Sequence, residues 1–93
     1  MKHELNKPLT FEGKEYKDIN VPLESLTGDD IVVAEREFVA TGNAAGVAET
    51  SKAFQAYVAA RAAKVPVELI LSLGAKDFTA ITLQVQNFLL MQD

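Results

Sequence analysis

The C-terminal stretch constrains the fold more than any other, because it is long, apolar and uncharged. No charged side chain occurs between Asp77 and Asp93, although aliphatic and aromatic residues recur throughout. Their spacing predicts a helix that begins at about residues 75–77, with Asp77 near the positive end of its dipole. A surface helix normally carries charge on its outer face, so this one needs a different explanation.

The apolar side chains of this helix fall on two faces when residues are placed about 100° apart. Leu83 and Leu90 lie on one face, and the larger set lies near the opposite side. In one interpretation the helix is central in the monomer and buries both faces, and in the other the second face meets another protein chain. The two are not exclusive, since one face can serve the core and the other a partner. The candidate protein-binding residues, not yet divided between core and interface, are Phe78, Ile81, Leu83, Val85, Phe88, Leu89 and Leu90.

The N-terminal part of the chain predicts a β-hairpin over about residues 5–21. An extended run ends at Phe11, and Pro8 restricts it to an edge strand because proline cannot donate to a ladder. The sequence Glu12-Gly13-Lys14 then favours a turn, with glycine where a positive φ is easiest. A lone hairpin is marginally stable in water, so we expect it to pack on helices or on another chain.

Helices are predicted from about residue 27 to residue 91. Thr27 is a suitable N-cap, with Asp29 and Asp30 in the first turn, and Gly42 is a suitable left-handed C-cap. Residues 43–50 are weakly patterned and read as a loop or a frayed turn.

An alanine-rich helix is expected over about residues 51–64. Pro66 then breaks the chain, and a short apolar segment runs to Gly74. Alanine favours a helix intrinsically and lets a neighbouring helix approach closely.

These elements predict a single α+β domain over residues 1–93, mostly helical, with an N-terminal hairpin followed by three to four helices. The length of 93 residues suits one domain with a limited core. Hydrophobic residues make up 48% of the chain and charged residues 24%, which is a globular composition.

Residue types that carry chemistry are scarce. The chain has no cysteine, and His3, its one histidine, is expected in a mobile terminus. Gly42 and Gly46 are not followed by the Lys-Ser/Thr of a phosphate-binding loop. We therefore expect no catalytic residue, no metal site and no cofactor, and an enzyme is the class that the sequence favours least.

The formal net charge of −4 disfavours a nucleic-acid partner. One alternative remains open, a helix-turn-helix regulator built from residues 67–73 and the terminal helix. That helix would lack a phosphate anchor, because no Lys or Arg follows Lys76. No signal core or membrane span is recognisable, so we expect a cytoplasmic protein without a membrane partner.

The order of elements resembles the small tail assembly chaperones of long-tailed bacteriophages and related prophage elements. The similarity covers about residues 9 to 90. It rests on an aspartate at the first helix start, a Leu-x-x-x-Asp pattern before the last helix and a terminal Val-x-x-Phe-Leu pattern. The segments that carry it are Leu26-Thr27-Gly28-Asp29-Asp30-Ile31, Leu69-Ile70-Leu71-Ser72-Leu73-Gly74-Ala75-Lys76-Asp77-Phe78 and Val85-Gln86-Asn87-Phe88-Leu89.

The resemblance implies a non-enzymatic assembly factor that acts in the host bacterial cytoplasm and is absent from the mature virion. Such proteins bind the tape measure protein and keep it soluble until tail tube subunits polymerise around it. The implied partners are the tape measure protein, further copies of the chain and, as a weaker candidate, the tail tube protein. A generic oligomerisation or adaptor module from a mobile element is a second alternative.

Overall fold

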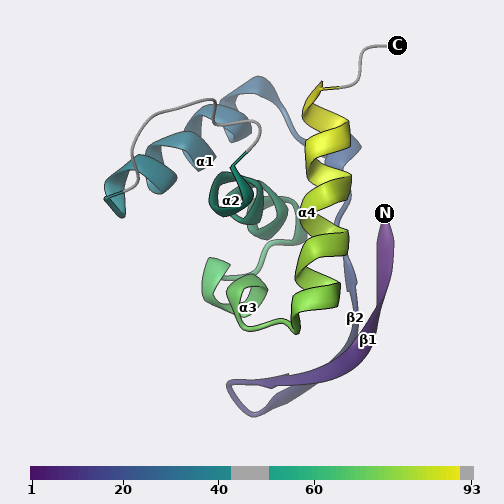
Figure 1. The fold of residues 1–93 in the computed structure, drawn as a ribbon. Coiled ribbons are helices and arrows are strands. Elements are labelled where there is room, and N and C mark those ends of the chain that lie inside the picture. Colours follow the sequence, from purple (N-terminus) through teal and green to yellow (C-terminus); the bar gives the residue numbers. More distant parts are fainter. Residues whose placement is uncertain (43–50, 91–93) are drawn as a thin grey trace.

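The computed structural model, which describes residues 1–42 and 51–90, has a two-stranded hairpin followed by helices (Figure 1). The predicted α+β fold with an N-terminal hairpin is therefore confirmed. Residues 43–50, predicted as a loop or a frayed turn, lie outside the described residues. The elements are β1 (Lys2–Phe11), β2 (Lys14–Asn20), the short 3-10 helix η1 (Leu23–Ser25), α1 (Gly28–Ala40), α2 (Lys52–Ala63), α3 (Val67–Leu71) and α4 (Ala75–Leu90).

The hairpin turn lies where the sequence predicts it. Glu12 and Gly13 have φ values of 50° and 80°, and Phe11 pairs with Lys14 across the turn. Two successive residues with positive φ match the right-handed twist of an antiparallel pair, which explains the glycine here.

The first strand begins earlier than the sequence predicts. It starts at Lys2, and the prediction that His3 lies in a mobile terminus is wrong, because His3 pairs with Ile19 of β2. The Met1 amino group also donates a hydrogen bond to the Val21 carbonyl oxygen at 2.9 Å. These contacts hold the first residues along the second strand. The alternation of side chains around His3 covers too few residues for the sequence to predict this part of the strand.

The ladder is interrupted in the middle of β1. Glu4 pairs with Asp18 and Leu9 pairs with Tyr16, so four residues of β1 face a single residue of β2. Pro8 lies in this bulge, where its missing N–H removes no ladder hydrogen bond. The bulge leaves neighbouring backbone N–H groups that need other acceptors.

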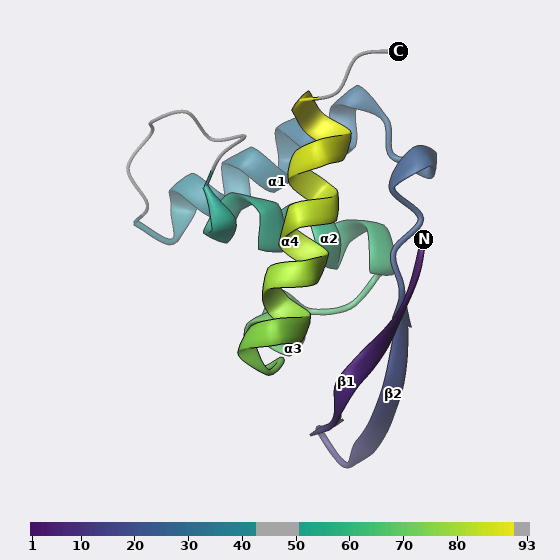
Figure 2. The same cartoon turned by 45° about the vertical axis from the view of Figure 1, so that its right-hand side comes forward.

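The Asp77 carboxylate, on the first turn of α4, supplies those acceptors. It accepts hydrogen bonds from the backbone N–H groups of Asn6 at 2.7 Å and Lys7 at 3.1 Å, and it lies 3.0 Å from His3 Nε2. Asp77 is 2% exposed. Burial raises the pKa of this carboxyl, but the hydrogen bonds outweigh burial and the pKa lies below its ordinary value. Asp77 thus joins β1 to α4, which lie side by side (Figure 2).

Helix α2 lies at the centre of the helical part and contacts α1, α3, α4 and η1. Its small side chains allow this, because Ala56 and Ala59 are fully buried and let neighbouring helices approach closely. Phe38 of α1 packs edge-on against Phe54 of α2, with ring centroids 5.7 Å apart. The predicted limits of this helix are confirmed, with Ser51 as N-cap and Lys64 as a left-handed C-cap.

The start of α1 is fixed by a capping box. The Thr27 side chain accepts from the Asp30 N–H at 3.3 Å, and Asp30 Oδ2 accepts from the Thr27 N–H at 2.9 Å. Asp30 Oδ1 also accepts from Arg61 Nε of α2 at 2.8 Å. The hydrogen bond from the Thr27 backbone, followed by the one from Arg61, lowers the pKa of Asp30. One carboxylate therefore begins α1 and attaches it to α2.

We expect Asp77→Asn to lower the free energy of unfolding by about 1–3 kcal/mol at neutral pH, because an amide cannot accept both backbone hydrogen bonds. The folded pKa of Asp77 is depressed, so its stabilisation is complete above the unfolded value of about 3.9 and is lost as pH falls through the folded pKa. Urea titrations over pH should show that the wild type loses more stability on acidification than the variant. Exposed Asp18→Asn is the control, and equal acid sensitivity of wild type and Asp77→Asn would contradict this role.

We expect Ala59→Leu to lower the free energy of unfolding by about 1–3 kcal/mol, because the added atoms overpack the contacts of α2 with its neighbours. Ala75→Leu is the matched control, since Ala75 is exposed at the start of α4. Thermal unfolding followed by circular dichroism measures both variants, and a similar change in Tm for the two would refute the central placement of α2.

Candidate functional site

The inner side of α4 belongs to the core of the chain. Ile81 and Val85 are fully buried, and Phe78 and Leu89 are partly buried and pack against the core cluster. Four of the seven candidate protein-binding residues therefore contribute to the monomer interior.

Phe88 departs from the apolar face to which the helical spacing assigns it. Its side chain is 40% exposed. Around the helix Phe88 lies between the positions of Ile81 and Asp77, which are both buried, so its angle does not explain its exposure. Phe88 lies in the last turn of α4, whereas Asp77 and Ile81 lie in the first two turns. The periodicity identifies the apolar face, but it does not show how far along α4 that face is covered.

The remaining candidates lie on the outside of α4. Leu83 is 49% exposed and Leu90 is 48% exposed, at the seven-residue spacing that places them on one line. After Lys76, every exposed residue of α4 is uncharged. We call this set the α4 outer face: Thr79, Leu83, Gln84, Asn87, Phe88 and Leu90.

Two uncharged polar residues of α4, Thr82 and Gln86, face α2 instead of solvent. Gln55 Nε2 donates to Gln86 Oε1 at 3.0 Å, and Lys52 Nζ donates to Thr82 Oγ1 at 3.3 Å. Gln55 is fully buried. The contact between α2 and α4 is therefore partly polar. Some of the uncharged polar residues of α4 serve this internal contact, and the others lie on its exposed surface.

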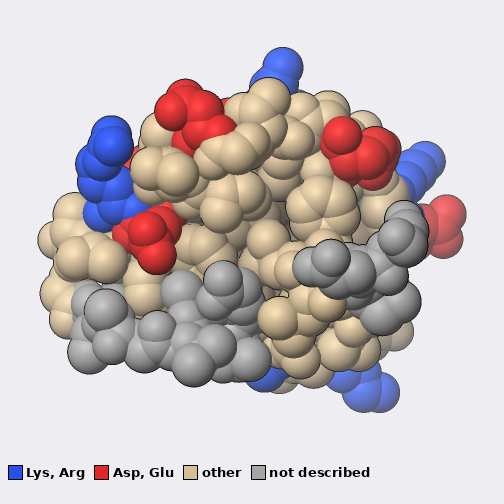
Figure 3. Space-filling view, turned by 90° about the horizontal axis from the view of Figure 1, so that it is seen from above, with Lys and Arg blue, Asp and Glu red and all other residues tan. Residues whose placement is uncertain are grey.

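A second exposed apolar pair on α1 was not found by the sequence reasoning. Val32 and Val39 are 49% and 48% exposed and flank a shallow hollow with Glu35, Arg36 and Ala40. Their seven-residue spacing, the same as that of Leu83 and Leu90, was the available signal. The molecule viewed from above, where the C-terminal end of α4 lies, is covered mostly by uncharged side chains (Figure 3).

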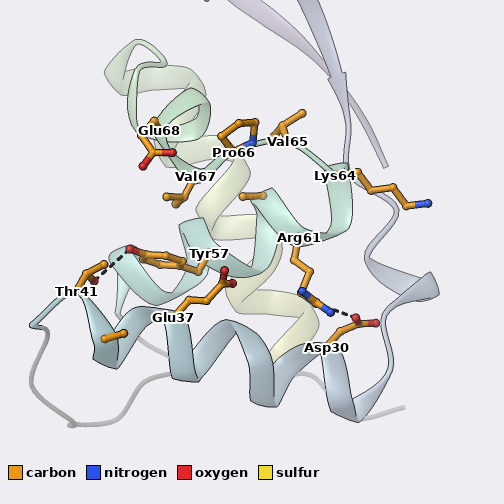
Figure 4. A pocket seen from close by; sticks show the side chains of 12 residues that line it. Asp30, Glu37, Thr41, Tyr57, Arg61, Lys64, Val65, Pro66, Val67 and Glu68 are labelled. Carbon is orange, nitrogen blue, oxygen red and sulfur yellow. Dashed lines mark hydrogen bonds and ion pairs between the residues drawn. The ribbon is translucent and has the colours of Figure 1, made fainter.

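A larger hollow of about 750 Å³ lies between α1, α2 and α3, and we call it the α1–α2–α3 groove (Figure 4). Its lining combines an aromatic ring, aliphatic side chains and several charged groups. The Tyr57 hydroxyl donates to Thr41 Oγ1 at 3.1 Å on one side of it. The lining residues are Asp30, Glu37, Ala40, Thr41, Tyr57, Ala60, Arg61, Lys64, Val65, Pro66, Val67 and Glu68.

Within residues 1–42 and 51–90, no group of three or more His, Cys, Asp or Glu side chains is placed to hold a metal ion. None of the helices described there combines the length and the apolar character that crossing a membrane requires.

Comparison with known proteins gives one family. The model of the family "Phage tail assembly chaperone proteins, E, or 41 or 14" matches residues 2–90, which is nearly the whole chain. No curated protein and no solved structure gives a significant match. The match agrees with the resemblance drawn from the motifs at residues 26–31, 69–78 and 85–89. The chain therefore belongs to the family of phage tail assembly chaperone proteins.

Proposed function

We propose that the chain self-associates and binds the tape measure protein, keeping it soluble before the tail tube polymerises around it. The observation that carries this proposal is the α4 outer face, which places three large apolar side chains in solvent with no charge beyond Lys76. Such a helix face is the kind of surface that a groove or helix of another chain covers.

A tape measure protein is expected to be long and helical, so its apolar faces would aggregate during assembly unless another chain covered them. A protein of 93 residues covers little of such a client. Several copies side by side would cover more, and each contact would raise the effective concentration of the next. Self-association and client binding are thus two parts of one function.

The acidic part of the chain supports solubility in the same role. Residues 1–49 hold ten acidic and five basic side chains, whereas residues 50–93 hold three and four. An excess of one charge keeps copies and their complexes dispersed while apolar faces are engaged. The work is non-catalytic, and we place it in the host cytoplasm before the virion is complete.

We expect Leu83→Asp with Leu90→Asp to give a folded protein whose self-association is weakened at least about tenfold, since loss of 1.4 kcal/mol of binding already has that effect. Analytical ultracentrifugation measures association, and circular dichroism checks the fold. Thr10→Asp with Asn20→Asp adds the same charge to two exposed hairpin positions and serves as the control. Association equal to that of the wild type would show that the α4 outer face is not the contact surface, and unfolding would place Leu83 and Leu90 in the core.

We expect co-expression with the tape measure protein of the same phage to increase the soluble fraction of that protein. The Leu83→Asp, Leu90→Asp variant should not increase it. The measurement is the distribution of the tape measure protein between the supernatant and the pellet after centrifugation. A tape measure protein that stays insoluble beside the wild-type chain, with both well expressed, would contradict the proposed client.

A further inference from the structure

We propose that copies of this chain join head to tail, with the α4 outer face of one copy seated in the α1–α2–α3 groove of the next. This inference rests on the proposed self-association and specifies its second surface. It identifies the groove as the receiving site and a second copy of this chain as its occupant.

The groove has the lining that an apolar helix face requires. Tyr57, Val65 and Val67 supply aromatic and aliphatic surface, and all three are partly buried, so they still have area to lose to a partner.

Glu37 of α1 and Glu68 of α3 are exposed, and both line the hollow (Figure 4). The groove thus combines apolar surface with these two exposed carboxylates. Its other charged side chains are Asp30 and Arg61, which pair with each other, and Lys64, which points away from the hollow (Figure 4).

Lys76, which precedes the α4 outer face, complements the carboxylates of Glu37 and Glu68. Lys76 is exposed and lies seven residues before Leu83, on the line that continues to Leu90. A helix that is positive at its first turn and apolar beyond it complements a lining of aliphatic, aromatic and acidic side chains, in which Glu37 and Glu68 are the carboxylates not paired with Arg61.

The two surfaces are separate within one molecule. No residue of α4 lines the groove, and α4 runs behind α2 when the groove is viewed from the front (Figure 4). A two-fold contact would pair the same patch on both copies, whereas a face and a groove on different sides of α2 pair different patches. Repetition of that contact extends a row of copies instead of closing a dimer. A row of copies matches the length of the proposed client, the tape measure protein.

Two variants test the arrangement. The groove variant, Glu37→Lys with Glu68→Lys, keeps its α4 outer face, and the face variant, Leu83→Asp with Leu90→Asp, keeps its groove. Each alone should self-associate at least about tenfold more weakly than the wild type. Mixed together, they share one intact face and one intact groove, so we expect a one-to-one dimer that grows no further, seen by analytical ultracentrifugation or light scattering.

The control for the groove variant is Glu12→Lys with Glu24→Lys, which makes the same change in net charge at exposed positions outside the groove. The control should associate as the wild type does. Adding Lys76→Glu to the groove variant should restore association, because the charges are then exchanged. Failure of that restoration would overturn the pairing of Lys76 with these carboxylates.

The failure of this inference is distinguishable from failure of the proposed function. If the face variant loses association while the groove variant assembles like its control, the copies meet through α4 alone and the head-to-tail arrangement is wrong. Absence of a dimer in the mixture has the same meaning. If the groove variant assembles normally but no longer solubilises the tape measure protein, the groove holds the client and not a second copy.

Discussion

The buried carboxylate of Asp77 is the interaction on which the rest of the structure depends. It satisfies two backbone N–H groups that the β1 bulge removes from the ladder, and it joins residues that are about 70 positions apart in the chain. A two-stranded hairpin alone is only marginally stable in water, and this attachment packs the hairpin against a helix. It also holds the first turn of α4 against the hairpin on the side of the helix that carries buried Ile81.

The small side chains of α2 explain why α4 has apolar residues left over. Fully buried Ala56 and Ala59 bring the neighbouring helices close, which makes the core tight but small. Only one face of α4 can enter such a core. Leu83 and Leu90 therefore stay at the surface.

Local signals in the sequence predict local structure well here. The Glu12-Gly13 turn, the Thr27 cap and the limits of the alanine-rich helix each depend on neighbouring residues alone, and each is confirmed. The role of Asp77 could not be predicted, because it depends on a bulge in a strand far away in the sequence. The exposure of Phe88 depends on how α2 and its neighbours cover α4, which spacing within one helix does not contain. The Val32 and Val39 pair was readable, since it repeats the spacing already noted on α4.

The amide pair between Gln55 and Gln86 limits how α4 can move along α2. A slide by one helical turn, about 5.4 Å, would separate these amides and also part Lys52 from Thr82, leaving polar groups in a dry contact. Apolar contacts alone would tolerate several positions of α4 along α2. The polar pairs select one of them, so every copy presents its exposed leucines at the same height, and any assembly built from those copies inherits a constant spacing.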